Sequence, residues 1–192
     1  MKKLSPVDVS FLTFESAETP MHIGNLQIYT LPKGAKATYI QELTDTLRDA
    51  PELAAPFNRI LSNPNPKIKF PKWLKADDVD MHYHVRHVAL PKPGSDENLH
   101  SLVSSIHSQS LDRNRPLWEV YVIEGLENNR FAVLFKIHHA CIDGVGGMRL
   151  MQASLSAEKG KNTFQVPWKK SMKKEIKRVR KSSFYSFISP MY

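Results

Sequence analysis

The residues of this chain best suited to chemistry are two adjacent histidines, His138 and His139, which open the stretch HHACIDG at 138–144. An imidazole has an unperturbed pKa of about 6.5, so it can take a proton near neutral pH. Asp143 follows His139 by four positions, where its carboxylate can brace the loop. Gly144 has no Cβ and lets backbone or substrate pass close. The pattern indicates a general base exposed at the end of a strand.

Two other interpretations compete with a catalytic one. A histidine pair in a strand is more often structural than catalytic, and histidine and aspartate are also metal ligands. Adjacent side chains on a strand point to opposite faces of the sheet, which suits one shared ion poorly. We therefore expect no metal at this motif.

The elements around the motif follow from hydrophobic periodicity and turn residues. Two β-rich runs, 117–124 and 130–137, flank residues 125–129 and predict a hairpin with a loop of moderate length that ends at the histidines. A helix is predicted after the motif, over 145–157, with early glycines that weaken its start.

The rest of the chain predicts a similar mixture. Strands are expected at 22–31, with a slip in its alternation, and at 81–90. Helices are expected at 38–50, begun by a capping box of Thr38 and Gln41, and at 96–109, capped by Ser95 or Asp96. Five prolines lie within 51–72 and predict a long irregular excursion.

Composition limits the class of protein. The chain has 192 residues, 41% hydrophobic and 24% charged, which suits one domain or one lobe of a larger protein. Cys141 is the single cysteine, so no disulfide can form within the chain and a reducing compartment is favoured. Polar residues interrupt the apolar start, and no run of about 18 apolar residues occurs, so we expect a cytoplasmic protein without signal peptide or membrane span.

The net charge of +8 is confined to one end of the chain. Residues 1–160 hold 18 Lys/Arg and 18 Asp/Glu, whereas residues 161–192 hold 9 Lys/Arg and one acidic residue, Glu175. A basic tail on a neutral body argues against nucleic-acid binding. Within it, 169–181 would form a basic amphipathic helix, suited to an anionic membrane or lipid-inclusion surface, to CoA phosphates, or simply to a solvated linker.

The motif resembles a known family. HHACIDG fits the HHxxxDG pattern of the chloramphenicol acetyltransferase-like acyltransferases, which include condensation domains and plant acyltransferases. Three further stretches resemble the bacterial wax ester synthase/diacylglycerol acyltransferases: LSPVDVSFLTFESAETPMHIGNLQIY at 4–29, DMHYHVRHVALPKPG at 80–94 and the block at 111–151 that contains PLWE. The resemblance covers roughly residues 4–160.

The resemblance implies an α/β fold of the chloramphenicol acetyltransferase-like kind, a mixed sheet with packed helices. It implies transfer of an acyl group from acyl-CoA, as substrate and not cofactor, to a long-chain alcohol or a diacylglycerol. His139 would be the base for direct attack on the thioester, so Cys141 is not a nucleophile. His138 would support it, Asp143 would fix the loop, and Gly144 would leave room for substrate.

Other residues are assigned more weakly. His22 would lie at a strand entry or approach the substrate channel. Trp118 would be a core residue, and Glu119 would help to position the motif. His82, His84 and His87 suggest a metal cluster, but no metal comes with the resemblance, and structural or channel-lining roles fit them better.

Family members are about twice as long and have two similar lobes with a channel between them. We therefore expect residues 1–160 to form the amino-terminal lobe and residues 161–192 to be a basic linker or tail toward a second lobe, which completes the enzyme. Two alternatives remain open: a non-catalytic lobe that binds or scaffolds a lipid surface, and a condensation-domain-like acyltransferase that acts on an amine.

Overall fold

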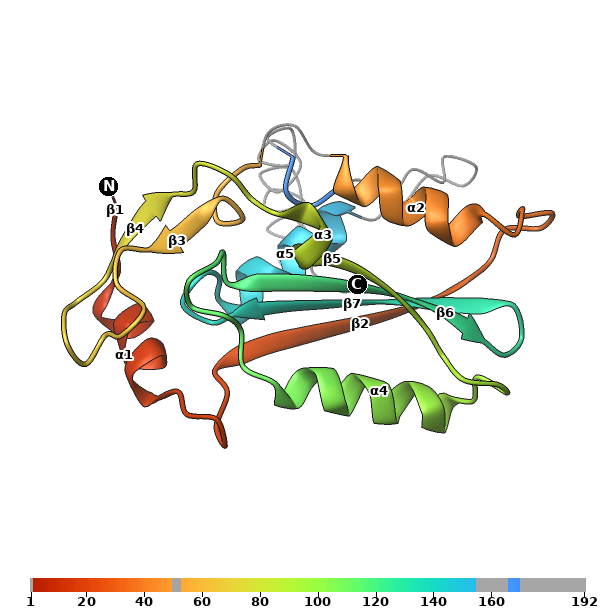
Figure 1. Ribbon diagram of the computed structural model, residues 1–192, viewed down its shortest axis with the longest axis horizontal. Helices are drawn as coiled ribbons and strands as arrows, with labels where there is room; N and C mark the ends of the chain where they lie inside the picture. The colour runs from red at the N-terminus through yellow and green to blue at the C-terminus, as the bar shows by residue number, and fades with distance from the viewer. Residues whose placement is uncertain (1, 50–52, 155–165, 170–192) are drawn as a thin grey trace, which may run out of the picture.

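The predicted hairpin forms the centre of the principal sheet. A computed structural model describes residues 2–49, 53–154 and 166–169 (Figure 1). In it β6 (Trp118–Leu126) pairs antiparallel with β7 (Arg130–His138). Asn128 and Asn129 make the turn with φ of 60° and 54°, a left-handed conformation that asparagine tolerates better than most residues. The hairpin and its position before the two histidines are confirmed.

The outer strands make this sheet mixed. Its order is β2-β7-β6-β5. β2 (His22–Thr30) runs antiparallel to β7 in nine consecutive pairs. The slip in its apolar alternation reflects packing on both faces, because Ile23 and Tyr29 contact one core cluster and Leu26 the other. β5 (Val85–Ala89) runs parallel to β6, and α4 (Asp96–Ser108) makes the crossover between them. The α/β class with a mixed sheet and packed helices is confirmed.

Helices cover both faces of the sheet. α2 (Tyr39–Arg48) lies on one side and α4 on the other, and α5 (Gly144–Ser154) follows the histidines (Figure 1). Because strand side chains alternate, Val120 and Phe135 pack in the cluster that holds Leu47 of α2, whereas Leu134 packs in the cluster that holds Leu99 of α4. This alternation decides which polar residues of β6 and β7 lie beneath α4.

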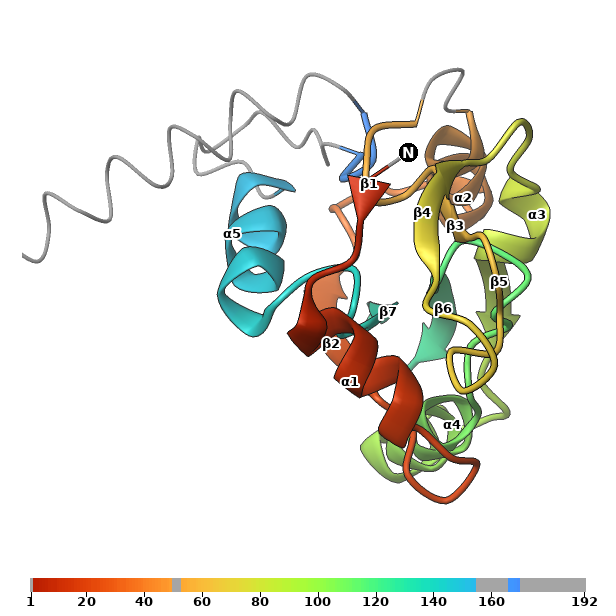
Figure 2. The ribbon, with the colours of Figure 1, turned by 90° about the vertical axis from the view of Figure 1, so that its left-hand side faces the viewer.

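A second, small sheet lies at one end of the molecule. β1 (Lys2–Lys3), β4 (Lys72–Lys75) and β3 (Arg59–Leu61) pair antiparallel in the order β1-β4-β3, next to α1 (Pro6–Phe14) (Figure 2). The expectation of a wholly irregular segment at 51–72 is wrong. Its prolines bound the strands without interrupting them, since β3 lies between Pro56 and Pro64 and β4 begins after Pro71.

The expected strand at 81–90 is shorter than predicted. α3 (Met81–His84) takes the first four residues, and β5 begins only at Val85. The reason is local: the Asp80 carboxylate accepts hydrogen bonds from the backbone N–H groups of His82 and Tyr83, and so caps a helical turn.

Helix starts show how far capping signals can be read from sequence. Ser95 and Asn98 form a capping box at α4, as the predicted Ser95 cap requires. The capping box expected from Thr38 and Gln41 is absent. The backbone of Thr38 is already in the helical conformation, and its hydroxyl donates to the Glu42 carboxylate instead of capping a backbone N–H. α1, which was not predicted as a helix, begins with a capping box of its own.

The basic tail falls largely outside the described residues. Only Val166–Lys169 of the region 161–192 belongs to them, so the predicted amphipathic helix at 169–181 stays a prediction. In the part of the chain that the structure describes, no helix is long and apolar enough to cross a membrane.

Candidate active site

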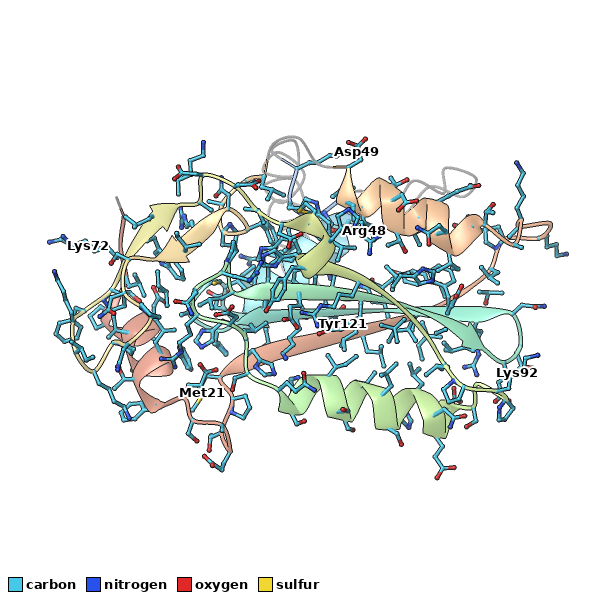
Figure 3. All side chains as sticks on the ribbon, viewed as in Figure 1. Met21, Arg48, Asp49, Lys72, Lys92 and Tyr121 are labelled. Carbon is cyan, nitrogen blue, oxygen red and sulfur yellow. The ribbon has the colours of Figure 1, made fainter. Side chains whose placement is uncertain are left out.

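The two histidines lie at the end of β7, where the chain turns toward α5. His138 is the last residue of the strand, and it pairs with His22, the first residue of β2. The backbone N–H of His139 donates to the Met21 carbonyl at 2.9 Å. Figure 3 shows Met21 between the end of α1 and the start of β2. The motif is therefore anchored to the segment that links the first helix to the sheet.

His138 is completely buried, and its two ring nitrogens have different roles. Nδ1 accepts a hydrogen bond of 3.0 Å from the backbone N–H of Ala140, which makes Nε2 the protonated nitrogen of the neutral ring. Nε2 lies 3.4 Å from Oε1 of Glu15, a long polar contact and not a well-aligned hydrogen bond. His138 thus holds the turn that carries His139 and is not itself open to substrate.

Glu15 is a buried carboxylate that ties several segments together. Its side chain is 4% exposed; Oε2 accepts from Nη2 and Nε of Arg113 at 2.8 and 3.1 Å, and Oε1 accepts from the Met21 N–H at 3.0 Å. Burial alone would raise the pKa of Glu15, but His138, the Met21 N–H and Arg113 outweigh it and lower the pKa from 4.5 to about 2. Glu15 is therefore ionised at neutral pH.

His139 lies at the surface end of this arrangement. Its ring stacks on Phe11 of α1, with the centroids 4.2 Å apart and the planes 17° from parallel. The residue is partly exposed, but its ring Nδ1 is buried and, among the described residues, has no hydrogen-bond partner. Packing against Phe11 holds the imidazole, and the hydrogen bond to the Met21 carbonyl holds the backbone that carries it.

Asp143 and Gly144 begin α5. The Asp143 carboxylate accepts a hydrogen bond of 2.5 Å from the Gly146 N–H, and its carbonyl accepts one of 2.8 Å from the Gly147 N–H. Asp143 is exposed and serves as the N-cap of the helix. A Cβ built on Gly144 would meet nothing within 4 Å, so space is open beside it.

This geometry separates two ways in which Asp143 could act. Asp143→Ala removes the cap and is expected to lower the free energy of unfolding by about 1 kcal/mol, whereas Asp143→Asn keeps a good cap and should change it little. Urea titrations of both variants measure the difference. Equal losses in the two variants would show that the negative charge, and not the cap, is what stabilises this loop.

His22 faces α4 and not an open channel. It is 8% exposed, and its Nε2 lies 2.7 Å from the His107 carbonyl and 3.2 Å from Nδ1 of the His107 ring. Burial, and then the charge of Lys136, lower the pKa of His22 to about 4, so it is neutral at pH 7. The buried Lys136 in turn donates to the carbonyls of Ile106 and Gln109 at the end of α4.

The two residues from PLWE lie on opposite faces of the sheet. Glu119 is 5% exposed and accepts a hydrogen bond of 2.7 Å from the Tyr121 hydroxyl, with Arg86 at 3.4 Å. Glu119 pairs across the strands with Lys136, and Lys136 precedes His138 by two residues. Trp118, on the other face, is 1% exposed and stacks on His84 and Trp168 in the core.

The remaining candidates do not join this site. His82 is exposed, His84 is buried beneath Trp118, and His87 lies near Glu124. Within residues 2–49, 53–154 and 166–169, no group of three or more His, Cys, Asp or Glu side chains could hold a metal ion. Burial raises the pKa of the Cys141 thiol to about 12, so the thiolate needed for nucleophilic attack is scarce at neutral pH.

Glu15 and Arg113 were missed by sequence reasoning. They are 98 positions apart, and neither lies in a sequence motif that predicts an ion pair. The available signal was weak: both residues lie within stretches that resemble family blocks, Glu15 in 4–29 and Arg113 in 111–151. Their contact shows that the loop before β6 and the end of α1 jointly support the histidine turn.

Solved structures establish the class of fold. The chain matches the first condensation domain of the calcium-dependent antibiotic synthetase with a TM-score of 0.54 and 15% identity, over 80% of this chain and 37% of that chain. It matches the wax ester synthase/diacylglycerol acyltransferase from Marinobacter aquaeolei VT8 with a TM-score of 0.81 and 40% identity, over 88% of this chain and 40% of that chain. The fold is of the chloramphenicol acetyltransferase-like class.

Sequence relatives narrow the class to one family. The family model for the wax ester synthase/diacylglycerol acyltransferase catalytic domain matches residues 4–189. O-acyltransferase WSD of Acinetobacter baylyi is 41% identical over 169 residues, and the probable diacylglycerol O-acyltransferase Tgs4 of Mycobacterium tuberculosis is 41% identical over 175 residues. The chain belongs to the wax ester synthase/diacylglycerol acyltransferase family. These matches include 88% of this chain but only 35% of each relative.

Proposed function

We propose that this chain is the amino-terminal lobe of an enzyme that transfers a fatty acyl group from acyl-CoA to a long-chain alcohol or a diacylglycerol, giving a wax ester or a triacylglycerol. The observation that carries the proposal is His139, a partly exposed histidine held at a strand end by Phe11 and the Met21 carbonyl. Family membership supports the class of reaction, and the names of the relatives support the acceptors.

The proposed chemistry needs one base and no covalent enzyme intermediate. His139 takes the proton from the acceptor hydroxyl while its oxygen attacks the thioester carbonyl carbon. The C–S bond then breaks, an ester forms, and the CoA sulfur leaves with the proton returned by the imidazolium. The acyl donor is consumed as a substrate, and the reaction needs no metal or other cofactor.

The neighbours of His139 would act through it. His138 positions the turn through its hydrogen bond to Ala140, the residue after His139. Glu15 acts through Met21, whose carbonyl binds the His139 N–H. Asp143 sets the start of α5, and Gly144 leaves open space where substrate can pass. None of these groups needs to exchange a proton with the substrate.

A second lobe is part of the proposal. The chain spans 35% of its curated relatives, and a base at a strand end acts only when hydroxyl and thioester meet it within about 3 Å in a site that excludes water. One lobe supplies the base and would leave one wall of the acyl channel open. The enzyme would act in the cytoplasm, at the edge of a membrane or lipid inclusion where its apolar substrates gather.

The test is the release of free CoA from a long-chain acyl-CoA. We expect little or no acceptor-dependent release by the 192-residue chain alone, and recovery when a second lobe is joined to it or added as a separate chain. A fatty alcohol, a diacylglycerol and an amine are compared as acceptors. Robust turnover by the monomeric chain alone contradicts the two-lobe requirement.

The acceptor comparison also tests the proposed class of reaction. Preference for the amine favours a condensation-type reaction. No turnover with any acceptor, although the two lobes are shown to associate, favours a non-catalytic lobe.

A further inference from the structure

The end of the molecule opposite Lys92 carries an unusual combination of exposed apolar and basic side chains. Figure 3 places Lys72 at this end. Within the lysine loop, residues 62–72, Ile68 is 80% exposed and Phe70 is 77% exposed. Neighbouring apolar side chains that form an exposed patch rimmed by polar residues often mark a site that meets a membrane or another molecule. The exposed side chains of Ile68 and Phe70 therefore form a candidate binding surface.

The lysine loop is held in shape by its own hydrogen bonds. Ser62 closes it at the base, where its N–H donates to the Lys72 carbonyl and its hydroxyl accepts from the Lys72 N–H, both at 2.9 Å. Inside the loop, the Asn63 side-chain amide donates to the carbonyls of Asn65 and Lys69 at 2.7 and 3.0 Å. The two apolar side chains are thus presented by an ordered loop, which lowers the entropic cost of binding.

The charge of this segment has one sign. Residues 53–76 contain five Lys/Arg and no Asp or Glu. Lys67, Lys69 and Lys72 are exposed and alternate with Ile68 and Phe70. Lysine can keep its ammonium group at a polar boundary while its stem follows apolar surface. Apolar side chains that alternate with lysines are suited to a lipid membrane, which has anionic headgroups at its surface and hydrocarbon chains beneath them.

An apolar groove continues this surface onto α1. It has a volume of about 410 Å³, and its lining includes Leu4, Val9, Phe70 and the two lysines Lys3 and Lys72. Figure 2 looks onto this end of the molecule, where α1 and the lysine loop face the viewer. The groove extends the apolar area beyond the two loop side chains and brings Lys3, from the chain start, beside Lys72 of the loop.

We propose that the lysine loop and the start of α1 dock this chain onto an anionic lipid surface, with Ile68 and Phe70 inserted among the acyl chains and the lysines on the headgroups. The surface alone carries this inference, which does not depend on acyl transfer. It does bear on the candidate site, since α1 lines the groove with Val9 and stacks Phe11 on His139. Docking here would bring the site close to lipid-borne substrates.

Sedimentation with vesicles tests the docking. The 192-residue chain should bind vesicles of phosphatidylcholine with phosphatidylglycerol, and binding should weaken with salt. Because each lysine near an anionic surface is worth about fivefold in affinity, Lys67→Gln/Lys69→Gln should weaken binding at least about tenfold. The matched control is Lys36→Gln/Lys92→Gln, which removes two exposed lysines outside the loop and should bind like the wild type.

A second pair of variants tests insertion. Ile68→Ser/Phe70→Ser should also lose at least about tenfold, since it removes the apolar side chains from the bilayer. Ile28→Ser, at an isoleucine that is 45% exposed on β2, is the control and should be unchanged. All variants keep the basic tail, so differences between them belong to the loop. Wild-type binding by both loop variants would overturn the proposal.

Fluorescence distinguishes lipid from other occupants. The three native tryptophans are at most 5% exposed, so a tryptophan introduced by Phe70→Trp reports on the loop. Its emission should shift to the blue on vesicles and be quenched by brominated acyl chains. A blue shift that instead depends on protein concentration without lipid, or that appears only when a second lobe is added, would assign the surface to a protein partner and overturn lipid docking.

Discussion

His139→Ala, made in the chain joined to a second lobe, is expected to lower the rate of acyl transfer by about 10²–10⁴-fold. The reason is the loss of the group that takes the proton from the acceptor hydroxyl, without which the hydroxyl is a weak nucleophile. Folding should change little, because the residue is partly exposed and its contacts are one stacking partner and a backbone bond that alanine keeps. CoA release and thermal unfolding measure the two effects separately.

Two comparisons make this result specific. His82→Ala removes an exposed histidine of α3 that lies outside the site, and its activity should match the wild type. His138→Ala removes a buried histidine that binds Ala140 and faces Glu15, and it should lose both stability and activity. Near-normal ester formation by His139→Ala would end its assignment as the base.

Glu15→Ala is expected to lower the free energy of unfolding by about 3–5 kcal/mol. It leaves the Met21 N–H without an acceptor, and it leaves the Arg113 guanidinium with the Leu12 and Pro64 carbonyls but without its carboxylate. Glu18→Ala, at an exposed residue three positions along, should change it by less than about 0.5 kcal/mol. Denaturant titration at neutral pH measures both. A loss of stability by Glu15→Ala no larger than that of the control would show that the pair contributes nothing to folding.

The pH dependence gives an independent check on Glu15. Its pKa falls from 4.5 to about 2 on folding, so the unfolded chain binds more protons between these values. The stabilisation is therefore fully present above about pH 4.5 and is lost as the pH falls toward 2. The difference in stability between wild type and Glu15→Ala should shrink over that range, and a difference that stays constant would rule out the carboxylate as its source.

Sequence determined the elements whose causes are local. The hairpin of β6 and β7 follows from two β-rich runs around a turn that ends in Asn128 and Asn129, and the start of α4 follows from Ser95. The adjacency of His138 and His139 at the end of β7 follows in the same way. A local pattern suffices here because the bonds that form these features join residues only a few positions apart.

Tertiary structure decided what supports the histidines. Glu15 meets Arg113 across 98 positions, and Lys136 meets the end of α4 across 27 and 30, so no short pattern reveals either contact. Trp118 was expected in the core, but which sheet face it and Glu119 each occupy, and which helix covers that face, was decided only by packing. Such contacts arise only when packing brings distant segments together, because a buried carboxylate or ammonium is stable only where the fold supplies its partners.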